Sequence, residues 1–219
     1  MHARDLEDIW GHSTRWILCS LILFGSGRCT VADEPLVAAL SSVCRITQGP
    51  HSGTAFLVQL PRPAESDNST VALVTAAHAL ERMTGPECRM ILRRHDKENG
   101  FVRREIVAPL RQDDQPVWVR HATADVAAFV VSLPPDSAMK PLAFEQLVAD
   151  PSQFAAVFSV GRDAWMPCYP ATTEANSAGW PILRRGSIAS YPLSPVENIK
   201  TFSIDVRAFG GESGAPVVI

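Results

Sequence analysis

Three residues of the chain have the side-chain types of a nucleophilic catalytic triad. His78 follows an apolar run and two alanines, Asp125 precedes the apolar run 126–131, and Ser213 lies among glycines in the segment 210–214. A serine hydroxyl becomes a strong nucleophile when a histidine accepts its proton and an acid holds that histidine in one tautomer. Each of these residues alone is common in structural roles. The three together predict acyl-transfer chemistry.

The order of the three residues along the chain distinguishes between architectures that carry such a triad. α/β-Hydrolases have the order Ser, acid, His, and subtilisins have Asp, His, Ser, whereas this chain has His, Asp, Ser. The serine motif agrees with this distinction, because a nucleophile elbow is G-x-S-x-G and Ala215 stands at the last glycine position. Both of these architectures are therefore excluded.

The elements that must position the three residues are short strands. Turn residues separate six β-branched runs, which predict one small antiparallel barrel and lie at 43–47, 54–60, 71–75, 90–94, 102–108 and 126–133. The polar segment 134–143 contains three prolines and is typical of a linker. Further runs predict a second β unit and lie at 154–160, 182–190, 201–206 and 216–219.

Composition supports a folded domain without a strongly charged surface. The chain has 219 residues, of which 46% are hydrophobic, and this is enough for two small barrels. Its 20 basic and 23 acidic side chains give a net charge of −3. Nucleic acid is not an expected partner, because binding the phosphate backbone requires a basic surplus.

The N-terminal segment 1–32 is predicted to be a signal peptide. The apolar run 16–24 follows Arg15, and the small residues 30–32 precede Asp33, where a signal peptidase would cleave. A helix needs about 20 apolar residues to span a bilayer, so the nine of this run predict no stable membrane anchor. We therefore expect a secreted or periplasmic protein. The alternative is a frayed apolar tail.

Several of these segments resemble the trypsin-like, chymotrypsin-fold serine peptidases, most closely the secreted bacterial type. Residues 75–78 (TAAH) are similar to the family's histidine box, residues 125–127 (DVA) to its D-[LIV]-A strand, and residues 211–214 (GESG) to its G-[DN]-S-G loop. Weaker likeness covers 51–56 (HSGTAF) and 186–190 (GSIAS). Together these segments extend over about residues 43 to 219.

The resemblance implies an all-β fold of two antiparallel six-stranded barrels. The first barrel would occupy 33–133 and the second 144–219, with the linker 134–143 between them. Only six residues follow Ser213, whereas the family continues through two more strands. We therefore expect the second barrel to be incomplete at its C-terminal end.

The resemblance also implies a function, that of a serine endopeptidase with a protein or peptide substrate and neither metal nor organic cofactor. Ser213 would attack the peptide carbonyl, His78 would serve as base and then as acid, and Asp125 would orient His78. The backbone N–H groups of Gly211 and Ser213 would form the oxyanion hole. The alternative is a catalytically silent protein-binding module of the same fold, or an inactive fragment.

Arg207 and Glu212 are two departures within the nucleophile region. Arg207 lies six residues before Ser213, where the family has the floor of its primary specificity pocket, and a cation there would imply a preference for acidic side chains. The other interpretation is a solvated surface arginine. Glu212 stands where the family usually has Asp or Asn, and the chain has no Ile-Val-Gly-Gly activation sequence.

Three cysteines remain beyond the predicted signal peptide, and their spacing does not fit a zinc site. The family's first and fourth strands are neighbours, so the resemblance implies a possible disulfide between Cys44 and Cys88. The alternative is three buried, reduced thiols, including Cys168.

Overall fold

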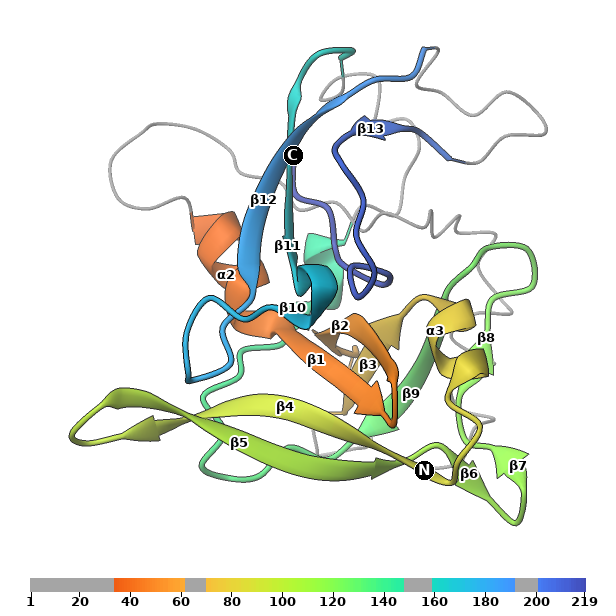
Figure 1. The fold of residues 1–219 in the computed structure, drawn as a ribbon, viewed down its shortest axis with the longest axis vertical. Helices are drawn as coiled ribbons and strands as arrows, with labels where there is room; N and C mark the ends of the chain where they lie inside the picture. Colours follow the sequence, from red (N-terminus) through yellow and green to blue (C-terminus); the bar gives the residue numbers. More distant parts are fainter. Residues whose placement is uncertain (1–33, 62–69, 148–158, 192–200) are drawn as a thin grey trace.

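The computed structural model describes residues 34–61, 70–147, 159–191 and 201–219 (Figure 1). The all-β class predicted from the sequence is confirmed, since most regular structure in these ranges is strand and the helices are few and short. The predicted signal peptide 1–32 and most of the predicted run 154–160 lie outside the described residues. Signal peptide and secretion therefore stay predictions. No helix in the described ranges is long and apolar enough to cross a membrane.

The first and larger sheet has eight strands. Seven form a hydrogen-bonded path in the order β5-β4-β1-β2-β3-β9-β8, every pair of it antiparallel, and the eighth, β10, pairs in parallel with β2. Their bounds are β1 Val43–Gln48, β2 His51–Gln59, β3 Val71–Thr75, β4 Glu87–Asp96, β5 Gly100–Pro109, β8 Val119–Arg120, β9 Ala127–Val131 and β10 Leu142–Ala143. No ladder between described strands joins β5 to β8, so a closed six-stranded barrel is not observed there.

The central strands β2, β3 and β9 are apolar without alternation because both faces of the sheet are covered. In β2, Ala55 and Leu57 belong to one core cluster, whereas the intervening Phe56 belongs to a second cluster on the opposite face. The second cluster also contains Tyr169 and Val218 from the C-terminal part of the chain. A strand that is buried on both faces needs apolar side chains at successive positions.

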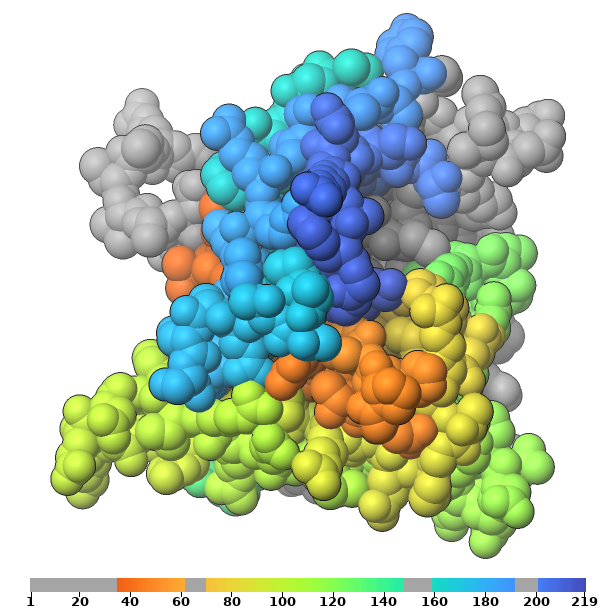
Figure 2. Space-filling view, viewed as in Figure 1, coloured from red at the N-terminus to blue at the C-terminus, as the bar shows by residue number. Residues whose placement is uncertain are grey.

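The second unit is a three-stranded antiparallel sheet in the order β11-β12-β13. Its strands are β11 Asp163–Cys168, β12 Ile182–Ile188 and β13 Ile204–Asp205. Val218 forms a further bridge to Trp165 of β11, with both N–H to oxygen distances at 2.8 Å. Figure 2 shows this unit, in shades of blue, seated against β1 and the β4–β5 hairpin.

Short elements complete the described chain. Helix α2 (Glu34–Ser42) leads into β1, and helix α3 (Ala77–Arg82) follows β3. The remaining elements are the β6–β7 hairpin (Arg111–Gln112 and Gln115–Pro116) and the 3-10 helices η1 (Phe144–Gln146) and η2 (Pro170–Thr172). The predicted linker 134–143 lies along the first sheet, where the Ala138 N–H donates to Arg93 O at 2.8 Å.

Arg93 of β4 joins the two units. Its side chain is fully buried, and its guanidinium lies 4.3 Å from the centre of the Trp180 ring. The guanidinium donates to one phenol and four main-chain carbonyls, those of Tyr169, Leu40, Ser41, Val43 and Gly179. Hydrogen bonds to carbonyl oxygens thus replace the carboxylate that a buried cation usually requires.

The predicted disulfide between Cys44 and Cys88 is not formed, because both thiols are free and buried. The register pairs Arg45 with Ile91 and places Cys44 opposite residue 92, four positions from Cys88. Four residues of extended strand span about 13 Å, whereas bridged cysteines have Cα atoms less than about 7 Å apart. The strands are neighbours as expected, but their register keeps the two thiols apart.

Candidate active site

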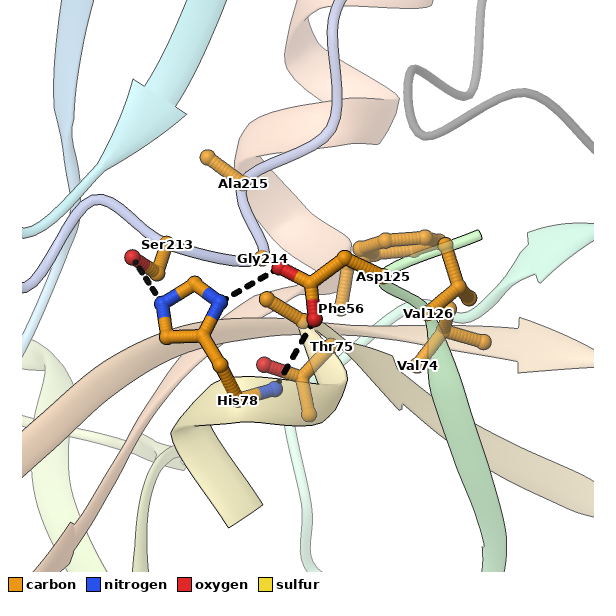
Figure 3. A pocket seen from close by; sticks show the side chains of 10 residues that line it. Phe56, Val74, Thr75, His78, Asp125, Val126, Ser213, Gly214 and Ala215 are labelled. Atoms are coloured by element: carbon orange, nitrogen blue, oxygen red, sulfur yellow. Dashed lines mark hydrogen bonds and ion pairs between the residues drawn. The ribbon is translucent and has the colours of Figure 1, made fainter. Parts of the chain in front are cut away.

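The predicted triad residues lie together where two neighbouring strands meet the C-terminal loop (Figure 3). β3 and β9 are antiparallel, with Thr75 opposite Ala127, so the end of β3 lies beside the start of β9. His78 follows β3 in the first turn of α3, and Asp125 precedes β9. The antiparallel register therefore brings together two residues that lie 47 positions apart in the sequence.

The three side chains form a continuous hydrogen-bonded chain. His78 Nε2 lies 2.9 Å from Ser213 Oγ, and His78 Nδ1 lies 2.5 Å from Asp125 Oδ2. The main-chain N–H of His78 also donates to Asp125 Oδ1 at 2.9 Å. Because an ionised carboxylate only accepts hydrogen bonds, Asp125 favours the tautomer with hydrogen on Nδ1, which leaves Nε2 to accept from Ser213.

Asp125 is ionised more readily than an ordinary aspartate, although it is partly desolvated. Burial by itself raises the pKa of this carboxyl, but the hydrogen bonds from the His78 side chain and main chain outweigh burial and lower the pKa overall. The side chain is 45% exposed, and that of His78 is 37% exposed. The acid and the histidine are thus open to water.

The glycines of the nucleophile loop are required by its backbone and its close packing. Gly214 has φ +89°, and a Cβ on it would lie 2.2 Å from Thr75 Oγ1 and 2.3 Å from the carbonyl oxygen of Thr54. Gly211 has φ +91°, and a Cβ there would lie 2.5 Å from Tyr169 O. Only glycine adopts these conformations without strain at so short an approach.

The amides predicted to form an oxyanion hole are the main-chain N–H groups of two residues in this loop. Within the described ranges, the N–H groups of Gly211 and Ser213 donate to no other protein group. Two unpaired N–H groups on alternate residues of a tight loop are suited to bind one developing oxyanion.

Glu212, between these two amides, is buried and paired with an arginine that the sequence did not indicate. Its carboxylate forms an ion pair with Arg184 of β12 and accepts a hydrogen bond from the Phe209 N–H at 2.9 Å. The glutamate is 7% exposed, and the arginine 17%. A buried acid in a glycine loop does signal a cationic partner, but sequence alone cannot select among 20 basic residues.

Replacement of Arg184 by methionine is expected to lower the free energy of unfolding by about 3–5 kcal/mol, because the Glu212 charge would remain buried without its partner. Urea denaturation measures this loss. The additional substitution Glu212→Gln should recover most of the loss by removing the stranded charge.

The neighbouring Arg185 provides a matched control. It pairs with Asp163 on the surface, where the two side chains are 59% and 45% exposed. An exposed ion pair contributes at most about 1 kcal/mol. Equal stability losses in Arg184→Met and Arg185→Met would contradict the importance of the buried pair.

Arg207, the predicted specificity residue, lies on the surface. Its guanidinium is 5.2 Å from the centre of the exposed Phe209 ring. A cavity of about 200 Å³ adjoins Ser213, His78 and Asp125, and Arg207 is not one of the residues that line it. Apolar side chains, among them Phe56 and Val126, form the wall of this cavity near Asp125. The role of Arg207 in specificity stays a prediction.

The solved structures that resemble this fold include two serine proteases, although no protein-family model and no curated protein matches the sequence. One is a serine protease of a human pathogenic astrovirus, with 17% identity, 81% coverage of this chain, 75% coverage of that chain and a TM-score of 0.43. The other is the Rv3671c protease in an inactive form, with 19% identity, coverages of 83% and 74%, and a TM-score of 0.42. This chain is similar to both serine proteases in fold.

No group of three or more His, Cys, Asp or Glu side chains that could hold a metal ion occurs among the residues that the structure describes.

The three cysteines in these ranges are poorly suited to nucleophilic roles. Burial raises the pKa of each thiol to about 12, so each remains protonated near neutral pH. The Ser213 hydroxyl, by contrast, lies within hydrogen-bond distance of His78 Nε2.

Proposed function

We propose that this protein is a serine endopeptidase that hydrolyses peptide bonds through an acyl-enzyme intermediate. The observation that supports the proposal is the hydrogen-bonded chain from Asp125 through His78 to Ser213, with 2.5 Å at Nδ1 and 2.9 Å at Nε2. An acid that orients a histidine base, which in turn accepts the proton of a serine hydroxyl, is one established way to activate that serine for nucleophilic attack.

In the acylation step, Ser213 Oγ bonds to the carbonyl carbon of the substrate while its proton moves to His78 Nε2. The carbonyl π electrons move to the oxygen, which then carries a negative charge and faces the N–H groups of Gly211 and Ser213. One such donor is worth about 3 kcal/mol in the transition state. The oxyanion electrons then re-form the carbonyl as the C–N bond breaks, and Nε2–H protonates the leaving amine. Ser213 is left as an ester.

In the deacylation step, water replaces the amine. His78 Nε2 accepts a proton from water as the water oxygen bonds to the ester carbonyl carbon, and the proton then passes to Ser213 Oγ as the ester bond breaks. Asp125 holds Nδ1–H throughout and stabilises the positive charge on the ring. These steps need only the groups that the site contains and water.

A catalytically silent binding module is the second candidate function. The observation that favours it is the exposure of the triad, since the Asp125 side chain is 45% exposed and that of His78 37%. Water around these groups screens the charge interactions on which the transition state depends. Such a module would bind a protein segment in the cleft beside Ser213 without cleaving it.

A fluorophosphonate probe distinguishes the two candidates. The endopeptidase is expected to take up one probe per chain, and mass mapping should locate it on Ser213. Ser213→Ala should abolish labelling, whereas Ser187→Ala, on β12, should label like the wild type. A folded wild-type chain that takes up no probe and leaves a denatured protein substrate uncut would rule out the endopeptidase.

A further inference from the structure

Four successive main-chain carbonyls of the nucleophile loop are each held by a hydrogen-bond donor. They belong to residues 210 to 213, and the bonds are Ala171 N–H to Gly210 O at 2.7 Å, Thr54 Oγ1–H to Gly211 O at 2.7 Å, Ala215 N–H to Glu212 O at 3.0 Å and Thr54 N–H to Ser213 O at 2.9 Å. Every peptide plane through this loop is therefore anchored.

These carbonyl bonds set the direction of the amides that would meet the substrate. In a trans peptide the C=O and the following N–H point in opposite directions. The bond to Gly210 O thus orients the N–H of Gly211, and the bond to Glu212 O orients the N–H of Ser213. The plane that begins at Gly211 lies between these two, and the plane that begins at Ser213 follows the second. Thr54 holds both of these planes.

Thr54 is the one residue that contributes two of these four bonds, and its hydroxyl is the one side-chain donor among them. Its side chain is fully buried in β2. The hydroxyl oxygen also accepts from the Tyr169 N–H at 3.2 Å, and the Thr54 carbonyl accepts from Thr75 Oγ1 at 2.7 Å. All polar groups of Thr54 are thus engaged, and they join the first sheet, the segment after β11 and the nucleophile loop.

The loop needs such an anchor because two successive glycines precede the acid before Ser213. Gly210 and Gly211 precede Glu212, and glycine rotates about its backbone bonds more freely than any other residue. The Gly211 carbonyl belongs to the peptide plane between Gly211 and Glu212, and among the described residues it accepts a hydrogen bond from the Thr54 hydroxyl alone. Without that hydroxyl, nothing described would hold this carbonyl. The amide of Ser213 lies directly after that plane.

We propose that Thr54 is a positioning residue for the oxyanion hole. Its hydroxyl keeps the Gly211 carbonyl turned into the protein, and so keeps the Gly211 and Ser213 amides directed at the substrate oxygen. This inference rests on the proposed endopeptidase function. Thr54 acts only through the loop and does not touch the reacting atoms.

The test compares Thr54→Val, which keeps the branched shape and removes the hydroxyl, with Thr54→Ser, which keeps the hydroxyl. In Thr54→Val we expect kcat for a peptide substrate to fall about 10- to 100-fold with KM within about threefold, because small displacements of catalytic groups have effects of this size. Affinity for a peptide aldehyde, whose hemiacetal oxygen occupies the oxyanion hole, should fall by a similar factor. Thr54→Ser should keep at least about a third of wild-type kcat.

A matched control is Thr47→Val on the neighbouring strand β1, which should leave kcat and aldehyde affinity unchanged. Urea unfolding shows which variants are folded. If Thr54→Val does not fold, Thr54→Cys takes its place in the test, because a thiol is a weaker hydrogen-bond donor of similar size. Wild-type values of kcat and aldehyde affinity in a folded valine or cysteine variant would overturn the role of Thr54. A wild-type chain without turnover would instead reject the proposed function, and the positioning role with it.

Discussion

The variant His78→Ala is expected to lower kcat by about 10⁴- to 10⁶-fold, because Ser213 loses the only described base within hydrogen-bond distance of its hydroxyl. The remaining rate would come from the oxyanion hole and substrate binding. The variant should stay folded, since the His78 side chain is 37% exposed and contributes little to the core. Steady-state hydrolysis of a peptide substrate measures the loss.

The appropriate control for His78 is His95→Ala. His95 lies at the exposed end of β4, where the centre of its ring is 5.0 Å from that of the tilted Phe101 ring. Its replacement should not affect turnover. Residual activity of His78→Ala within about tenfold of the wild type would contradict the assignment of His78 as the general base. Such a result would favour the silent binding module, because the hydrolysis would then come from a contaminant in the preparation.

Replacement of Asp125 by asparagine is expected to lower kcat by about 10⁴-fold through the tautomer of His78. The His78 N–H donates to Oδ1, so the asparagine would keep its oxygen there and turn its NH₂ group toward Nδ1. Nδ1 would then have to accept, and the ring hydrogen would move to Nε2. A protonated Nε2 cannot take the proton of Ser213.

Two further variants make the Asp125 prediction specific. Asp125→Ala places no amide against Nδ1, so it should lose less activity than Asp125→Asn. Asp136→Asn removes a surface carboxylate that pairs with Arg104, and it should leave kcat unchanged. An Asp125→Asn enzyme with kcat within about tenfold of the wild type would show that Asp125 does not determine the tautomer.

The lowered pKa of Asp125 also predicts how stability changes with pH. A carboxyl with a lower pKa in the folded chain than in the unfolded chain stabilises the fold at pH values above its ordinary pKa. This contribution is lost as the pH falls through the lowered pKa. Urea unfolding measures the stability difference between wild type and Asp125→Asn. This difference should therefore disappear when the pH falls below the lowered pKa of Asp125.

Local sequence was sufficient to predict the triad candidates and the class of the fold. Glycines around a serine, an acid before an apolar strand and a histidine after one are patterns within a few residues. Their chain order excluded two other architectures, and the structure brings all three side chains into contact. The antiparallel strands were equally predictable, because β-branched runs and turn residues indicate them locally.

Strand register was beyond the sequence-based prediction. Cys44 and Cys88 do lie on neighbouring strands, but the pairing of Arg45 with Ile91 separates the thiols. The pairing of β10 with β2 was not predicted either, because β10 lies within the segment 134–143, where a linker was expected. Register depends on how many side chains find partners across the whole sheet, and composition does not reveal this.

The amino-acid sequence by itself determined which groups could do chemistry here: a hydroxyl, an imidazole, a carboxylate and a glycine loop. Only the tertiary structure decided how that loop is held. Arg184 reaches Glu212 across 28 positions, and Thr54 reaches Gly211 across 157. The physical reason is that a buried charge or carbonyl must be satisfied by whichever donor folding brings near, and that donor need not be a neighbour in the chain.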